Sequence, residues 1–170
     1  MARNLDIYQI LSPAQITAIT EPTPASDRER RQGPGGRRLD YVSIGWVIDK
    51  LNAVFAFDWS NEVGTPVIGD DQIYVPVRLI VNVRDAEGRL VSTIVKSQVG
   101  VDDIRRRDGE PAQLGNAVKA AISDGIKKCA SLLGIAADVY GGESDQRRPT
   151  AAPAARRPPA PAPAPAPAAA

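Results

Sequence analysis

The alternation of apolar and polar residues predicts a run of strands in the middle of the chain. Residues 72–83 are rich in Ile, Val and Tyr, and residues 90–101 repeat the pattern after Asp85-Ala86-Glu87-Gly88. That tetrapeptide is typical of a tight turn, with Gly88 at the left-handed position. Residues 59–67 form another strand pattern just before. We therefore expect an antiparallel meander of three strands.

Helical periodicity flanks these strands on both sides. Before them, one apolar helical face is formed by Val47, Ile48, Leu51, Val54 and Phe55. After them, apolar residues recur at steps of three and four: Leu114, Val118, Ala121, Ile122, Gly125, Cys129, Leu132 and Leu133. This second stripe is the clearest amphipathic helix in the chain. Pro111 lies where it could start, and Gly134 suits its C-terminal cap.

Weaker signals lie nearer the N-terminus. Ser12-Pro13 predicts a short helix over 14–19, with Ser12 as its cap and Pro13 at its first position. Residues 21–32 interrupt this region with mixed charges, and the Gly-rich residues 33–36 predict a loop. Weak strand character follows over 37–43. The whole order predicts an α+β fold with helices packed on an antiparallel sheet.

Composition changes sharply near residue 141 and divides the chain. Residues 149–170 are almost entirely Ala and Pro, which can form neither a helix nor a core. We expect a disordered Ala/Pro-rich tail over 141–170, a folded domain over 25–140 and an N-terminal segment over 1–24. A chain of 170 residues then holds one modest core.

Charge and residue types exclude several classes of function. Lys and Arg total 21 against 20 Asp and Glu, so any basic site must be local. The absence of histidine removes Ser-His-Asp and Cys-His nucleophiles and most zinc sites. The carboxylates are scattered and no nucleotide-loop pattern occurs, so we expect no catalysis, metal or cofactor. A single cysteine, no long apolar run and no signal peptide favour a cytoplasmic protein without membrane contact.

The remaining candidates for chemistry are cationic. Arginines flank the Gly-rich loop, namely Arg28, Arg30, Arg31, Arg37 and Arg38. Guanidinium groups beside a glycine turn could clamp an anion. An equally good interpretation is a solvated loop whose arginines are partly neutralised by Asp27, Glu29 and Asp40.

A second cationic set lies on the long helix, opposite its apolar stripe. Lys119, Ser123 and Lys127 are four residues apart and share a face, and Lys128 lies beside them. Such lysines are usually a solvated face, and Lys128 can pair with Asp124 at the i,i+4 spacing. A third set, Arg105 to Arg107, is more simply a solubilising turn.

Three other residues have structural explanations that we favour. Cys129 has core spacing on the long helix, and Trp59 opens a strand next to an apolar helix. Trp46 could stack on a base, but a place in the core or an interface is the better interpretation.

The order of these motifs is similar to one known family. Arg31-Gln-Gly-Pro-Gly-Gly-Arg-Arg-Leu-Asp-Tyr-Val, followed by Leu51-Asn52, Phe55 and Trp59, resembles the N-terminal domain of the Rad-fifty-two family of single-strand annealing proteins. Ala121-Ile-Ser-Asp-Gly-Ile-Lys-Lys128 resembles that family's Ala-Val-Thr-Asp-Gly-Leu-Lys-Arg helix. The resemblance covers roughly residues 25–140 and includes the short bacterial and phage members, DdrA-like end-protection proteins among them.

The resemblance implies a β-β-β-α core, a homo-oligomeric ring and ATP-independent annealing of DNA strands. By position, Arg31 matches the family's DNA-contacting Arg, Arg38 its Lys after the Gly-rich turn, and Lys127 and Lys128 its basic pair. Two positions depart from the family: Ser131 stands where a further basic residue is common, and Trp46 near a charged one. The groove then binds more weakly, or uses Arg37 or Lys96 instead.

These observations predict a sequence-independent, nucleoid-associated binder of single-stranded DNA that acts in recombination or break repair. Its expected DNA-binding residues are Arg31, Arg37, Arg38, Lys119, Lys127 and Lys128. A few cations in each subunit, repeated around a ring, form a continuous track that holds the DNA backbone and leaves the bases exposed. Its expected partners are single-stranded DNA, itself and, through the tail, a single-strand-binding or other repair protein. The alternatives are a DNA-end or single-strand protector that does not anneal, and a structural oligomeric adaptor; a metal-dependent nuclease ranks last.

Overall fold

The computed structural model describes residues 10–32, 38–107 and 110–140. In chain order the elements are α1 (Pro13–Thr20), η2 (Ala25–Asp27), β1 (Arg28–Gln32), β2 (Arg38–Val42), α2 (Ile44–Phe55), β3 (Trp59–Val63), β4 (Val67–Ile68), β5 (Gln72–Arg84), β6 (Leu90–Asp103), β7 (Arg106–Arg107), β8 (Glu110–Pro111), α3 (Leu114–Ser131) and α4 (Ala137–Tyr140). The predicted tail over 141–170 and the glycine loop over 33–36 lie outside the described residues.

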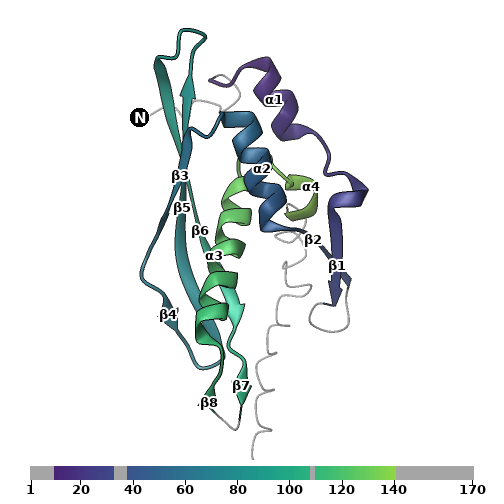
Figure 1. The fold of residues 1–170 in the computed structure, drawn as a ribbon, viewed down its shortest axis with the longest axis vertical. Coiled ribbons are helices and arrows are strands. Elements are labelled where there is room, and N and C mark those ends of the chain that lie inside the picture. The colour runs from purple at the N-terminus through teal and green to yellow at the C-terminus, as the bar shows by residue number, and fades with distance from the viewer. Residues whose placement is uncertain (1–9, 33–37, 108–109, 141–170) are drawn as a thin grey trace, which may run out of the picture.

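The predicted α+β fold is confirmed. Strand β5 pairs antiparallel with β3 on one side and with β6 on the other, so β3, β5 and β6 form a meander. Helices α2 and α3 cover one face of this sheet (Figure 1). Residues of β5 alternate between buried and exposed, because one face packs on the helices and the other carries no described element.

The sequence pattern predicted one continuous strand over 59–67, but the structure divides this stretch into two strands. Strand β3 ends at Val63, and pairing resumes only at β4. The break lies opposite Pro76 of β5, which has no N–H to donate. Its carbonyl still accepts a hydrogen bond from the Gly64 amide at 2.8 Å. The proline therefore divides this edge of the sheet in two.

Helix α3 lies unusually close to the sheet because two glycines meet there. A Cβ built on Gly100 of β6 would lie 1.8 Å from the Ala121 carbonyl oxygen, and one on Gly125 would lie 2.5 Å from a Val77 methyl. Neither position has room for a side chain. Cys129 packs one turn further on and is fully buried, as expected; burial raises the pKa of its thiol.

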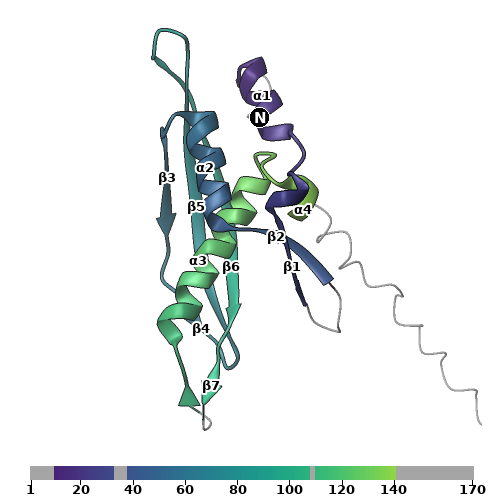
Figure 2. The same cartoon turned by 45° about the vertical axis from the view of Figure 1, so that its right-hand side comes forward.

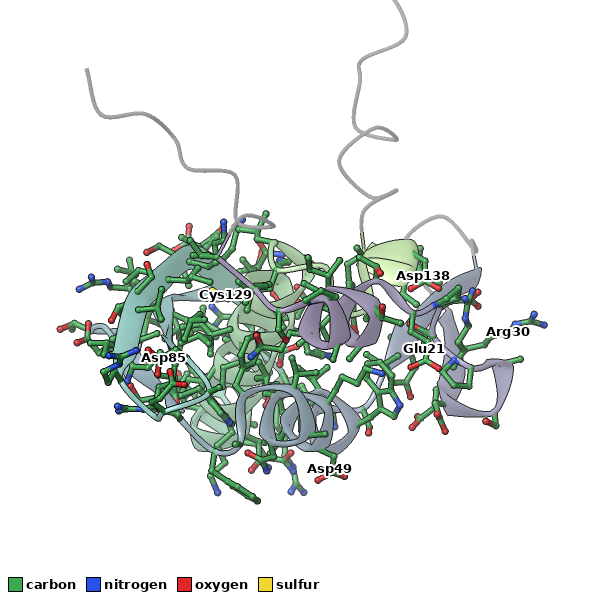
Figure 3. The ribbon with its side chains drawn as sticks, turned by 90° about the horizontal axis from the view of Figure 1, so that it is seen from above. Glu21, Arg30, Asp49, Asp85, Cys129 and Asp138 are labelled. Atoms are coloured by element: carbon green, nitrogen blue, oxygen red, sulfur yellow. The ribbon has the colours of Figure 1, made fainter. Side chains whose placement is uncertain are left out.

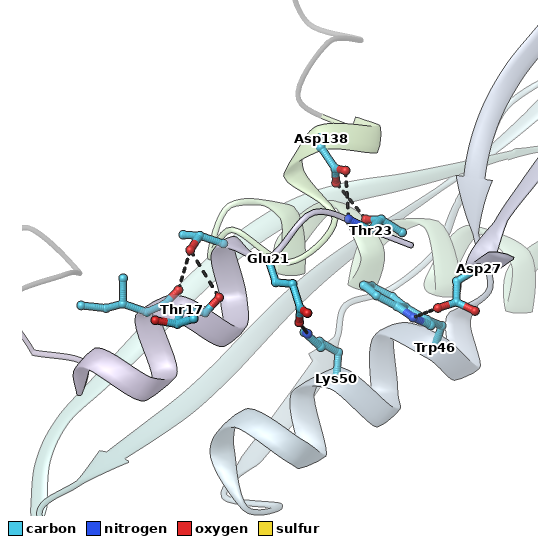
Figure 4. A network of polar contacts seen from close by, with 9 residues as sticks. Thr17, Glu21, Thr23, Asp27, Trp46, Lys50 and Asp138 are labelled. Carbon is cyan, nitrogen blue, oxygen red and sulfur yellow. Dashed lines mark hydrogen bonds and ion pairs between the residues drawn. The ribbon is translucent and has the colours of Figure 1, made fainter. Parts of the chain in front are cut away.

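Hydrogen bonds and ion pairs attach the N-terminal segment to α2 and α4 (Figure 4). Asp138 of α4 accepts from the Thr23 hydroxyl at 2.8 Å and from the Thr23 amide at 3.0 Å. Trp46 donates from Nε1 to Asp27 at 3.0 Å, which gives it a structural place in the half-buried periphery of the core. Lys50 of α2 reaches Glu21 at 2.8 Å.

Several local expectations are confirmed and others corrected. Ser12 caps α1, and Gly88 and Gly134 have positive φ. Leu132, however, is 47% exposed, because α3 ends at Ser131 and the chain turns away from the apolar stripe. The long helix also starts at Leu114, since Pro111 belongs to the short strand β8.

Candidate nucleic-acid interface

A two-stranded hairpin stands apart from the main sheet, beside the C-terminal half of α3 (Figure 2). Its strands β1 and β2 pair antiparallel from Arg28↔Val42 to Gln32↔Arg38. Tyr140 of α4 fixes its base: the hydroxyl accepts from the Val42 amide at 3.1 Å and donates to the Val42 carbonyl at 3.3 Å. Since Val42 is fully buried, the hairpin leaves the core with a defined direction.

Lys127 occupies the junction between this hairpin, α3 and α4. Its Nζ lies 5.9 Å from the centroid of the Tyr41 ring and 6.0 Å from that of the Tyr140 ring. The electron-rich faces of aromatic rings attract an ammonium group at this distance. The Tyr41 hydroxyl in turn donates to Glu29 on the paired strand. Two aromatic side chains thus hold the Lys127 ammonium in a half-buried position.

Lys128, the next residue, has different surroundings. Its Nζ forms an ion pair with Asp124 at 2.7 Å, at the spacing that the sequence suggested. The same carboxylate accepts a hydrogen bond from the Val101 amide at 3.0 Å, which joins α3 to the edge of β6. Much of the charge of Lys128 is therefore balanced within the subunit.

Lys119 and Ser123 lie further back along α3. Lys119 is exposed, and its carbonyl accepts from the Ser123 hydroxyl at 3.0 Å. Along α3, Lys119 is exposed, whereas Lys127 and Lys128 are half-buried, Lys127 beside the hairpin and Lys128 beside Asp124. Ser131 bonds to the Lys128 carbonyl at 2.8 Å, so its hydroxyl is turned toward the helix backbone.

The predicted arginines occupy different parts of the hairpin. The register pairs Arg31 with Leu39 and Arg38 with Gln32. Because positions alternate between faces along a strand, position 31 belongs to the same hairpin face as Tyr41, and position 38 to the opposite face. The structure thus brings position 31 to the Lys127 side and separates position 38 from it. Arg37 lies outside the described residues.

The opposite face of the hairpin borders an open cleft of about 310 Å³, lined by Thr23, Ala25, Arg28, Arg30 and Asp40. Both of its arginines pair with carboxylates: Arg28 with Asp138, and Arg30 with Asp40 at 3.3 Å. Figure 3 shows Arg30 at the outer end of the molecule, well away from Cys129. These ion pairs leave little net charge in the cleft.

Tyr41 and Tyr140 are parts of this site that the sequence pattern did not indicate. Tyr41 lies in the weak strand pattern over 37–43 and in the motif that resembles the known family, and Tyr140 is the last residue of the predicted folded domain. The contact joins residues far apart in sequence, so periodicity could not indicate it.

The described residues contain neither a metal-binding cluster nor a helix that could span a membrane. No group of three or more His, Cys, Asp or Glu side chains is placed to hold a metal ion in this part of the chain. Among the described helices, none combines the length and apolar character needed to cross a bilayer.

Comparisons with known proteins give one positive result. A search of curated proteins found no match. The profile of the Rad52/22 family of double-strand break repair proteins matches residues 13–154, which is most of the chain and includes every element described above. The two blocks that resemble this family in sequence are the ones that meet at Lys127. The chain therefore belongs to the Rad52/22 family of double-strand break repair proteins.

Proposed function

We propose that this protein binds single-stranded DNA through its phosphates and anneals complementary strands without ATP, as a homo-oligomeric ring. The observation that carries the proposal is Lys127, held between Tyr41 and Tyr140 where the hairpin meets α3. A cation held in place loses little side-chain entropy when it binds an anion. Lys119 and Lys128 on the same helix, and Arg31 on the adjacent hairpin, extend this surface; Arg37 and Arg38 are the further candidates.

The charge balance explains why the proposal needs several copies. The chain has a formal net charge of +1, and Arg28 and Arg30 of the hairpin and Lys128 of α3 are already paired with carboxylates. One subunit therefore offers few phosphate contacts. Copies side by side would align these contacts along one strand and release counterions without reading sequence. Bases that are not gripped stay available for pairing with a second strand.

The test measures binding of a fluorescent oligonucleotide across a salt series, and then pairing with its complement. Lys127→Ala should weaken binding to all sequences and reduce the slope of log K against log salt, because one phosphate contact per subunit is lost. Lys50→Ala is the matched control, since Lys50 lies on α2 and pairs with Glu21 at the end of α1. It should leave the slope unchanged.

The outcomes separate the alternative functions. Binding with faster pairing of complementary strands supports annealing. Binding without faster pairing favours protection of DNA ends or single strands. No binding to single-stranded DNA at low salt favours a structural adaptor and contradicts the proposal.

A further inference from the structure

The short helix α4 holds the base of the β1–β2 hairpin at two points. On β2, the Tyr140 hydroxyl accepts a hydrogen bond from the Val42 amide at 3.1 Å and donates one to the Val42 carbonyl at 3.3 Å. On β1, Arg28 forms an ion pair with Asp138. Because Arg28 and Val42 lie opposite each other in the register, α4 holds both strands at the same level.

The hairpin has little other support from the described elements. Apart from each other, β1 and β2 make their most extensive contact with α4. Figure 2 shows the two strands extending from the region of α4, to one side of the main sheet. The direction of the hairpin therefore depends on what happens at its base.

The bond between Tyr140 and Val42 is important because Val42 is fully buried. The Arg28 amide, which lies opposite, donates to the Ala25 carbonyl instead of to Val42. A buried peptide group that loses its hydrogen-bond partner destabilises the arrangement that buries it. Without the Tyr140 hydroxyl, the base of β2 would shift to satisfy both Val42 groups, and β1 would move with it.

Tyr140 also connects the hairpin to the candidate nucleic-acid interface. Its ring centroid lies 6.0 Å from the Lys127 Nζ, and the centroid of the Tyr41 ring, on the hairpin, lies 5.9 Å from the same atom. Position 31 shares the hairpin face of Tyr41. One side chain therefore contacts both Lys127 of α3 and the strand that places the hairpin beside it.

We propose that Tyr140 is a positioning residue for binding of single-stranded DNA. Its hydroxyl holds the hairpin in a fixed place relative to α3, so that Lys127 and Arg31 bind phosphates of the same strand together. Tyr140 acts through the hairpin and does not itself bind the DNA. A hairpin that is free to move has to be ordered when DNA binds, and this ordering lowers the affinity. The inference rests on the proposed function and names a residue that prepares the same site.

Tyr140→Phe tests the hydroxyl, because it keeps the ring over Lys127 and removes both hydrogen bonds to Val42. Binding of a fluorescent single-stranded oligonucleotide is measured over a salt series. The affinity should fall several-fold at every salt concentration, while the slope of log K against log salt stays unchanged, because the same phosphates are bound in the complex. Lys127→Ala differs in that it should reduce the slope as well.

Tyr74→Phe is the matched control. It also removes one tyrosine hydroxyl, which donates to Gln72 at 2.9 Å, but on β5 of the main sheet. Its affinity and its salt slope should be those of the natural protein.

Hydrogen exchange followed by mass spectrometry separates positioning from general stability. In Tyr140→Phe without DNA, amides of β1 and β2 should exchange several-fold faster, whereas those of β5 should exchange as in the natural protein. Faster exchange throughout the domain would show that Tyr140 only stabilises the fold, and would overturn the proposal. Asp138→Asn weakens the second point of attachment and should give the same pattern. The same measurements on Asp138→Asn decide the question if Tyr140→Phe does not fold.

The other outcomes distinguish this inference from the proposed function. Unchanged exchange in the hairpin overturns the positioning role, and so does faster exchange with unchanged affinity. A shallower salt slope in Tyr140→Phe also overturns it, because a phosphate contact would then have been lost. In each of these cases the natural protein still binds DNA and the proposed function stands. A natural protein that does not bind single-stranded DNA at low salt overturns both.

Discussion

Lys127 and its neighbours differ in where the structure holds their charged groups. Arg28, Arg30 and Lys128 each lie against a carboxylate. The Lys127 ammonium lies over the rings of Tyr41 and Tyr140, where the hairpin, α3 and α4 meet. Such rings attract a cation and restrict its position. This fixed place at the junction of three elements gives Lys127 the leading role in the proposed interface.

Ser131 gives the sharpest prediction at this scale. It lies one helical turn after Lys127 and Lys128, and its hydroxyl donates to the Lys128 carbonyl. Replacing it in Ser131→Arg adds a guanidinium beside the proposed phosphate path, so the affinity for single-stranded DNA should rise several-fold at moderate salt. The salt slope should become steeper by about one phosphate contact per subunit. Fluorescence anisotropy over a salt series measures both quantities.

Ser131→Gln controls for side-chain size without adding charge, and it should leave the slope as it is. An unchanged slope in Ser131→Arg would show that DNA does not pass this end of α3.

At the scale of elements, the close approach of α3 to β6 depends on glycine. Gly125→Ala would place a methyl 2.5 Å from a Val77 methyl in a packed core. Overpacking of this kind costs about 1–3 kcal/mol. Gly115→Ala in the same helix meets nothing within 4 Å and should stabilise by up to about 1 kcal/mol. Urea denaturation of both variants measures the difference, and equal effects would contradict this account of the packing.

The contact between α4 and the N-terminal segment should weaken in acid. Partial burial acts to raise the pKa of Asp138, but hydrogen bonds from Thr23 and the charge of Arg28 outweigh it, so the pKa lies below its usual value. A carboxylate with a lowered folded-state pKa stabilises the fold above its unfolded-state pKa. That contribution is lost as the pH falls through the folded-state pKa.

Asp138→Asn removes the titrating group while keeping most of the shape. The difference in unfolding free energy between the natural protein and this variant should be largest near neutral pH. It should shrink as the pH is lowered below about 4. Thermal unfolding followed by circular dichroism over this range measures it. A difference that does not change with pH would mean that Asp138 acts only through its shape.

The elements themselves were predictable where packing follows a regular period. The core-facing alternation of β5 and the buried face of α2 could be read directly, because burial imposes the same period on sequence and structure. Strand β1 could not, since Arg-Glu-Arg-Arg-Gln has no apolar alternation. It is a strand because β2 pairs with it and α4 holds β2 in place. The constraint that makes β1 a strand therefore comes from α4, which lies near the C-terminal end of the described residues.

The candidate site was predictable only in part for a related reason. The pairing of Lys128 with Asp124 could be predicted from the i,i+4 rule. The tyrosines around Lys127 could not, because they come from β2 and from α4. Spacing in sequence describes one element at a time, whereas the site forms where three elements meet.

For the whole molecule, assembly and DNA binding should be inseparable if several copies grip one strand. Val95→Lys places a charge among the exposed apolar side chains of β6, where it should disturb contact with another copy. The added lysine alone would attract DNA, but fewer linked subunits lower the effective concentration of phosphate contacts. Binding should therefore weaken markedly despite the extra positive charge. Ala53→Lys, on the exposed side of α2, adds the same charge away from β6 and should not weaken binding. Light scattering and anisotropy on both variants decide the matter, since a smaller assembly that binds DNA as tightly as the natural protein would show that each copy binds alone.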